Sequence, residues 1–253
     1  SERQATLRQS LGVRLRYYGR VKVGGTVAFF ENKDGFLYQW MTLNEGEISG
    51  VVENWLNDLQ VTLDANGYVE QEQYDEGEDE DGRVAQLHYK LGTAGQTVPA
   101  KLDAAFPEVT ADHRMRGVAN VLAIFQEVDG SEVTKVYPQL NPQVRAVINA
   151  SLVKSVRTGA RIWSDNPADI IYDYLTGVDG AGFAYGAGYA ESQVDLASFQ
   201  AFVNLCDEPV PLKAGGTIKR YRYWGGYSMA EEMRAVLPRM LRACDGDLYM
   251  TTE

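Results

Sequence analysis

The sequence is poor in cysteine and in histidine. Its 253 residues include two of each. Two cysteines are too few for the disulfide framework of a small secreted domain. Cys206 and Cys244 both fall in apolar helical patterns, so we expect two buried free thiols. The histidines, His88 and His113, lack the spacing to a second Cys or His that a zinc site requires.

Long apolar runs are also missing. None approaches the ~18 residues of a membrane-spanning helix. The first ten residues, SERQATLRQS, are polar and lack the apolar segment of a secretory signal. The sequence does not begin with Met, so we expect either that the Met was removed or that this is a piece of a longer chain.

Basic residues are fewer than acidic residues. There are 24 Lys and Arg against 35 Asp and Glu, which gives a formal net charge of −11. Sequence-independent binding of DNA or RNA requires a basic surface, so this balance argues against it. It suits a surface that DNA passes without binding, because like charges repel.

The clearest local signal is WSDNPADIIYDYLTG, residues 163–177. Asn166 is a helix-capping residue, and Pro167 suits the first helical position because no N–H is needed there. Apolar residues follow at helical spacing, and Gly177 is expected to end the helix in the left-handed conformation. A helix of this length, ~15 Å, is not stable alone. We therefore expect it to dock its apolar face on a larger body.

The chain before residue 160 is predicted to be mostly β. Short alternating segments bounded by Gly, Asn and Asp are typical of strands. A short helix is expected at 98–106, and turns at 57–58 and 65–67. The predicted strands are residues 13–17, 21–23, 27–29, 36–43, 48–56, 61–63, 84–91, 118–128 and 144–156.

The chain after residue 160 mixes helices with short strands. A second helix is expected to start at Asp195 and run to Cys206. The pair Ser228 and Glu231 has the spacing of a capping box and predicts a third helix, which Pro238 should kink or break. Strands are expected at 217–224, within a hairpin, and at 248–250. We predict an α+β, β-rich fold, with one part at 1–160 and a mixed α/β part at 161–253.

Two segments resemble ligand-binding loops in composition, but the spacing of their residues does not fit such loops. The acidic run DEGEDEDG at 75–82 would place Gly77 and His88 at the end positions of a calcium loop, where acidic ligands are needed. A solvated loop is the better interpretation. The Gly-rich stretch 177–190, with Gly180, Gly182 and Gly186, lacks the preceding strand and the spacing of a dinucleotide loop.

No residue is assigned a catalytic, cofactor-binding or metal-binding role. Asp112 beside His113 could orient a base, but a turn held by side-chain hydrogen bonds is the stronger interpretation. With 35 acids in the chain, neighbouring carboxylates arise by chance. The acid pairs considered as a glycosidase site are Glu45/Glu47, Glu191/Asp195 and Asp207/Glu208.

Several stretches, in order along nearly the whole chain, resemble one family. It is the tail-tip hub (tip attachment) proteins of phages with long non-contractile tails, which are lambda-like, and of gene transfer agents. The stretches are RVKVGG (20–25), EGEISG through WLND (45–58), TADHRMRGVA (110–119), WSDNPA through DYLT (163–176), NLCDEP (204–209), RYRYWG (220–225) and CDGDL (244–248).

The resemblance implies barrel-like hub domains with an α/β module carrying about three helices. It implies a structural virion protein without enzymatic activity or cofactor, assembled in the bacterial host cytoplasm. A homotrimer would join a distal tail protein to a central fibre or tip. It would close or gate the DNA channel without binding DNA specifically, and would meet the host surface only indirectly. Family chains are longer, so this sequence resembles the hub core, with 75–82 and 177–190 as additions.

Two other functions stay open. The many acids and exposed aromatic residues would suit a tail-associated enzyme that degrades cell wall or glycans. The Tyr-rich loop 183–189 would suit a receptor-binding or glycan-binding module.

Overall fold

The structure is a computed structural model that describes residues 12, 14–75, 82–139, 141–178, 182 and 184–250. Over these residues it contains thirteen strands and five α-helices. The predicted α+β, β-rich class is therefore confirmed. The sheets of the described residues are open, and none closes into a barrel. The acidic loop lies outside the described residues except for its two ends, as do Val13 and residues 179–181 and 183 of the Gly-rich stretch.

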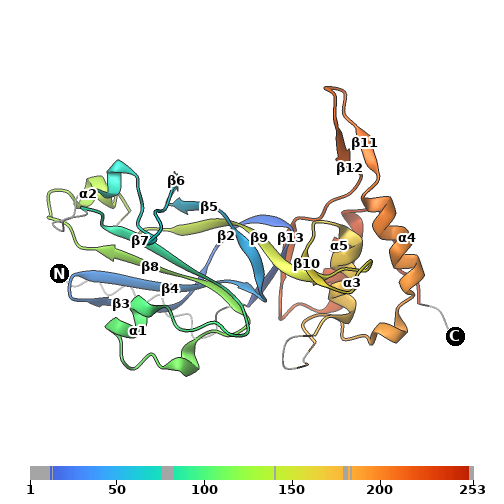
Figure 1. The fold of residues 1–253 in the computed structure, drawn as a ribbon, viewed down its shortest axis with the longest axis horizontal. Helices are drawn as coiled ribbons and strands as arrows, with labels where there is room; N and C mark the ends of the chain where they lie inside the picture. The colour runs from blue at the N-terminus through green and yellow to red at the C-terminus, as the bar shows by residue number, and fades with distance from the viewer. Residues whose placement is uncertain are drawn as a thin grey trace. The chain divides into compact units, whose positions relative to one another are not determined.

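The chain divides into two compact units (Figure 1). The first comprises Lys22–Asn44, Val51–Val147 and the described residues before Leu15. The second comprises Leu15–Val21, Glu45–Gly50 and the described residues from Ile148 onward. Each unit is therefore built from segments that alternate along the chain. The division into domains 1–160 and 161–253 of a longer tail protein stays a prediction.

The first unit is built on a four-stranded sheet of order β3-β4-β8-β7. The strands are β3 (Thr26–Lys33), β4 (Phe36–Glu45), β8 (Val118–Gln126) and β7 (Ala85–Leu91). A two-residue turn joins β3 to β4. Its residues Asp34 and Gly35 have φ of 50° and 78°, as hairpin turns of type I′ require.

Each face of this sheet is packed differently. Helix α1 (Ala100–Ala105) covers one face, where Trp40, Leu102 and Leu122 belong to one buried cluster. The other face carries Phe125, whose ring meets that of Tyr137 edge-on. Tyr137 directly follows α2 (Val133–Val136). The short helix η1 (Glu72–Tyr74) and the turn η2 (Ala111–His113) complete the helical elements of this unit.

A further sheet has the order β10-β9-β5-β6, with β2 paired to β9. Strands β2, β5 and β9 each contribute residues to both units. The bounds are β2 (Arg20–Gly24), β5 (Ile48–Leu56), β6 (Leu59–Val61), β9 (Val144–Lys154) and β10 (Arg161–Trp163).

The second unit is organised around helix α3 (Pro167–Thr176), and helices α4 (Leu196–Cys206) and α5 (Met233–Arg242) pack against it (Figure 1). The predicted start of α3 is confirmed, because Asn166 Oδ1 accepts a 2.9 Å bond from the Ala168 N–H and Pro167 is the first helical residue. Two antiparallel strand pairs and one short turn complete the described part of the unit. They are β1 (Leu15–Tyr18) with β13 (Gly225–Ser228), β11 (Pro209–Pro211) with β12 (Thr217–Lys219), and η3 (Glu191–Gln193).

The structure corrects two expectations about α3. All ten of its residues are buried, so it lies inside the second unit instead of docking one apolar face. Gly177 is extended, with φ −70° and ψ 135°, not left-handed. Glycine is needed there for space, because a Cβ would lie 2.3 Å from the Tyr185 ring and 2.4 Å from the Asp173 carbonyl oxygen.

Four expectations for the C-terminal part are also wrong in detail. The Ser228 N–H does donate to Glu231 Oε1 at 2.8 Å, but helix α5 begins only at Met233. The helix continues through Pro238, so the expected break does not occur there, and a kink at Pro238 stays a prediction. Residues 248–250 form no strand, and only 217–219 of the expected strand 217–224 pair as β12. Among the described residues, no strand pairs with 220–224 or with 248–250.

The close approach at Gly177 predicts the effect of adding one methyl group. We expect Gly177→Ala to lower the free energy of unfolding by about 1–3 kcal/mol, because the Tyr185 ring must move. Urea unfolding of the purified chain measures this. Gly95→Ala is the matched control, since its Cβ meets nothing within 4 Å, and it should be neutral or stabilising by up to about 1 kcal/mol. Equal losses in the two variants would contradict the packing argument.

Candidate functional site

His113 has a structural role in the turn η2. The Thr110 N–H donates to His113 Nδ1 at 3.1 Å, and the Thr110 hydroxyl lies 3.2 Å from the same nitrogen. The interpretation of residues 110–113 as a turn held by side-chain hydrogen bonds is confirmed. The ring nitrogen Nδ1 of His113 is therefore used within this turn.

His88 lies on β7 beside other polar groups. Its Nε2 is 3.1 Å from Gln86 Oε1, which also accepts a bond from the ammonium of Lys101. Burial, and then the Lys101 charge, lower the pKa of His88 to about 4, against a weaker opposing effect of Asp64. The imidazole is therefore neutral at pH 7.

The acid pairs Glu191/Asp195 and Asp207/Glu208 of the glycosidase interpretation are engaged in structural contacts. Asp195 caps α4 by accepting from the Ala197 and Ser198 N–H groups, and the hydroxyl and N–H of Ser198 lower the pKa of its carboxyl. Glu191 pairs with Lys154, and Glu208 with Arg220. Of the third pair, Asp207 belongs to the network described below.

Two carboxylates on the buried helix α3 bind the end of strand β9. Asp169 Oδ1 accepts a 2.8 Å bond from the Val156 N–H, and Asp173 Oδ1 accepts a 3.0 Å bond from the Lys154 N–H. Residues four apart on a helix are about 5–6 Å apart, which matches two residues of extended chain. The four-residue spacing of these acids thus fits backbone groups two residues apart.

Asp173 also forms the centre of a buried charged cluster. It is fully buried, with Arg16 Nη2 3.6 Å from Oδ2 and Arg161 Nη1 3.4 Å from Oδ1. The Tyr185 hydroxyl donates to Oδ1 at 2.7 Å. Burial of this hydroxyl, and then the Asp173 charge, raise the pKa of Tyr185 to about 12. Tyr185 is itself buried, and the Arg16 guanidinium lies over its ring.

The guanidinium of Arg16 contacts an aromatic ring, a carboxylate and a backbone carbonyl. It lies 3.7 Å from the centroid of the Tyr185 ring, and its Nη1 donates to the Glu45 carbonyl at 3.0 Å. Burial opposes its charge, but Tyr18, Tyr185 and Asp173 outweigh burial and raise its pKa above the ordinary value. A buried cation is tolerated only with such compensation.

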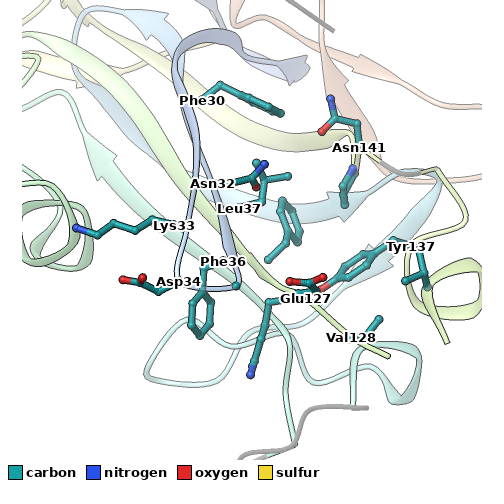
Figure 2. A pocket seen from close by; sticks show the side chains of 15 residues that line it. Phe30, Asn32, Lys33, Asp34, Phe36, Leu37, Glu127, Val128, Tyr137 and Asn141 are labelled. Carbon is teal, nitrogen blue, oxygen red and sulfur yellow. The ribbon is translucent and has the colours of Figure 1, made fainter. Parts of the chain in front are cut away.

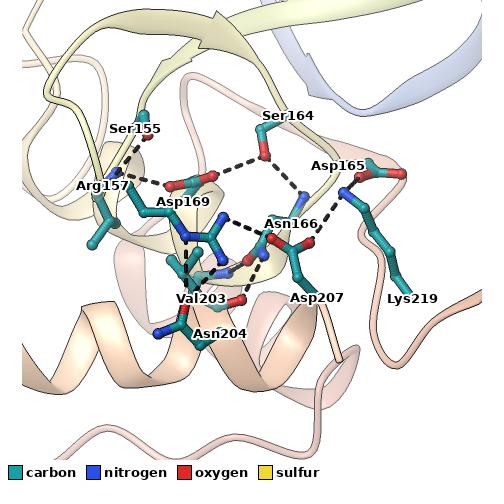
Figure 3. A network of polar contacts seen from close by, with 12 residues as sticks. Ser155, Arg157, Ser164, Asp165, Asn166, Asp169, Val203, Asn204, Asp207 and Lys219 are labelled. Carbon is teal, nitrogen blue, oxygen red and sulfur yellow. Dashed lines mark hydrogen bonds and ion pairs between the residues drawn. The ribbon is translucent and has the colours of Figure 1, made fainter. Parts of the chain in front are cut away.

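A second polar network surrounds the start of α3 (Figure 3). Asp165 Oδ1 accepts a 2.9 Å bond from Lys219, whose ammonium is also 3.1 Å from Asp207. Asp207 Oδ2 accepts from Arg157 at 2.7 Å. Burial opposes the charge of Asp207, but the bonds from Arg157 and Lys219 outweigh it, so its pKa is lowered. The Asn166 side chain donates to the Val203 carbonyl at 3.0 Å and so ties α3 to α4.

Three of the stretches that carry the family resemblance meet in this network. Residues 163–176 supply Asp165 and Asn166, and residues 204–209 supply Asp207. Residues 220–225 supply Arg222, whose Nε is 3.5 Å from Asp165 Oδ2. These stretches are separate in sequence and adjacent in the fold, and their polar side chains are used in packing the second unit.

The loop that follows α3 is attached to the helix. The Ala187 N–H donates to the Tyr174 carbonyl at 2.8 Å, and the Tyr189 N–H to the Leu175 carbonyl at 2.9 Å. Tyr189 packs against the core of the unit. The described tyrosines of the Tyr-rich loop thus have structural contacts.

Both cysteines are free and buried, as predicted. Burial, and then the neighbouring Cys244, raise the pKa of the Cys206 thiol to about 12. Burial raises the pKa of Cys244 to about 11. Such protonated thiols are poor nucleophiles and poor metal ligands at pH 7.

The first unit holds an open cleft of about 520 Å³ beside the β3–β4 turn (Figure 2). Phe30, Leu37 and Phe125 supply apolar surface, and Asn32 and Glu127 are among its polar side chains. None of these residues carries a motif, and no signal in the sequence marked the cleft. Arg16 and Arg161 were missed for a similar reason, since their partners come from distant segments.

Two negative findings apply to the residues that the structure describes. No group of three or more His, Cys, Asp and Glu side chains is placed to hold a metal ion. No described helix has the length and apolar character needed to cross a bilayer.

The comparisons with known proteins show distant similarity to solved structures only. No protein-family profile matches the sequence, and no curated protein matches it. A solved structure described as the virion of a native gene transfer agent particle is similar, with a TM-score of 0.45 and 16% identity. The match covers 90% of this chain and 48% of that chain, so this chain spans about half of its length. At this TM-score the similarity carries no conclusion about fold or function.

The buried cluster predicts a large effect of removing Asp173. Asp173→Ala leaves Arg16 buried without its carboxylate and should cost about 3–5 kcal/mol of unfolding free energy. Urea unfolding measures the loss. Arg234→Ala is the control, because its pair with Glu232 is exposed and should change stability by less than about 1 kcal/mol. A loss for Asp173→Ala no larger than that of the control would contradict the role of the cluster.

The lowered pKa of His88 predicts a pH dependence of stability. Between about pH 6.5 and 4 the unfolded state binds the proton and the folded state does not, so stability falls as pH falls through this window. His88→Gln should therefore show a shallower loss than the parent between these pH values. Unfolding midpoints at pH 6.5, 5.5 and 4.5 would test this, and parallel pH profiles would rule it out.

Proposed function

We propose that the chain is a structural protein of a phage-like virion. The observation that carries the proposal is the convergence of three family-like stretches on one polar network at the start of α3. Their Asp, Asn and Arg side chains hold helices and strands together. Such stretches are expected to recur among proteins that share a scaffold and not a reaction.

The finer proposal is the hub at the distal tip of the tail. In this role three copies surround the channel and join the distal tail protein to the central fibre or tip. The net charge of −11 supports it, because a negative lumen lets DNA pass without binding. The assembly closes or gates the channel, without catalysis, after forming in the host cytoplasm.

Cryo-electron microscopy of purified tails from particles that encode this chain tests the proposal. We expect density for three copies of each unit, fitted separately, around the tail axis at the tip. Tails from a deletion mutant complemented with the gene serve as the control. Well-resolved tips without such density would overturn the hub role, and absence from the whole particle would overturn the virion role.

A further inference from the structure

Strand β3 has a free edge within the described part of the first unit. It is the outermost strand of its sheet, and it pairs with β4. The register shifts between Val27 and Phe29, so the bulge leaves residues 29–33 as the regular section of the edge. An unpaired edge of this kind presents backbone N–H and C=O groups to any strand that arrives.

The turn determines which backbone groups point outward. Lys33 and Phe36 flank the two-residue turn and form a hydrogen-bonded pair, and such pairs alternate along an antiparallel ladder. Glu31 is then bonded to Tyr38, whereas the pairs of Phe30 and Asn32 are not hydrogen-bonded. The N–H and C=O groups of Phe30 and Asn32 therefore point away from β4.

The side chains of Phe30 and Asn32 both lie on the cleft side of the sheet. Phe29 stacks edge-on with Phe106, and Lys33 bonds the Ala105 carbonyl, so these alternate residues face α1. Alternation puts Phe30 and Asn32 on the opposite face, where both line the cleft. Phe30 is 38% exposed. The outward-pointing backbone groups of Phe30 and Asn32 thus lie beside the exposed apolar side chain of Phe30.

The cleft carries negative charge at the turn end. A Cβ on Gly35 would lie 4.0 Å from Glu127 Oε2, which places this carboxylate beside the turn (Figure 2). No Lys or Arg of the described residues pairs with it. Lys33, the one cation among the lining residues, is engaged with the Ala105 carbonyl on the α1 side.

We propose that this edge is a docking site for an extended segment of another protein. The segment adds to β3 as a further strand and bonds to the backbone groups of Phe30 and Asn32. It carries an apolar side chain and a Lys or Arg two positions apart. The apolar side chain packs on Phe30 and Leu37, and the basic one reaches Glu127.

The spacing follows from strand geometry. Residues two apart in a strand point to the same face and are about 6.6–6.8 Å apart. A segment with this pattern therefore places its apolar side chain over Phe30 and Leu37. Its basic side chain, two positions away, then lies nearer the turn. The inference does not depend on the hub proposal, because the purified chain alone can be tested.

The experiment measures binding of two peptides that carry fluorescein on the N-terminal amine, TTLTKTT-NH2 and its reverse-order form TTKTLTT-NH2 with Lys before Leu. The matched peptides have Glu in place of Lys. At low salt we expect one Lys peptide to bind about 5-fold more tightly than its Glu counterpart, as one partly exposed ion pair allows. N-methylation of alternate peptide amides on the β3-facing edge should abolish binding. Absence of saturable binding up to about 1 mM would overturn the proposal.

Two variants and one control assign the binding to this surface. Glu127→Lys should reverse the preference, so that the Glu peptide binds more tightly, and Phe30→Ser should weaken binding about 10-fold. Asp103→Lys makes the same charge change on α1, on the other face of the sheet, and should leave the preference intact. Urea midpoints confirm that each variant is folded. Binding that Glu127→Lys leaves unchanged, or that Asp103→Lys alters equally, would overturn the proposal.

Discussion

The second unit depends on two carboxylates, one turn apart on a helix that has no exposed face. Asp169 and Asp173 accept the backbone N–H groups of Val156 and Lys154 at the end of β9. A helix buried on all sides must find partners for every polar side chain it carries, since an unmade bond in the interior is costly. Here the two carboxylates bind backbone N–H groups at the end of β9 and so hold the helix against this strand.

The same helix concentrates the charges of this unit. Arg16 and Arg161 flank Asp173, while Lys219 and Arg222 meet Asp165 at the other end. Arg16, Arg161 and the neighbouring residues Lys219 and Arg222 come from three different parts of the chain. A scaffold built in this way gains a unique arrangement from its ion pairs, although isolated pairs add little stability. Such a unique arrangement is expected of a protein that must keep one conformation while it contacts neighbouring proteins.

Features that depend on residues close together in the sequence were predictable, whereas features that depend on tertiary contacts were not. The start of α3 follows from Asn166 and Pro167, which act within one turn, and the strands around Gly19 follow from alternation. Gly177 was misread because its need for space arises from Tyr185, a tertiary neighbour. The Asp173 cluster was invisible for the same reason. The Leu248–Met250 strand failed because alternation over three residues supplies no pairing partner.

The order of the segments has a consequence for synthesis. Strand β1 pairs with β13, so Leu15 lies opposite Ser228, about two hundred residues later in the chain. Residues of the first unit as far as Val147 emerge from the ribosome before that partner exists. A vectorially made chain therefore carries β1 as an unsatisfied strand while the first unit forms. Completion of the second unit is a late, non-local step, and a nascent chain halted before Gly225 would leave β1 open to association with other chains.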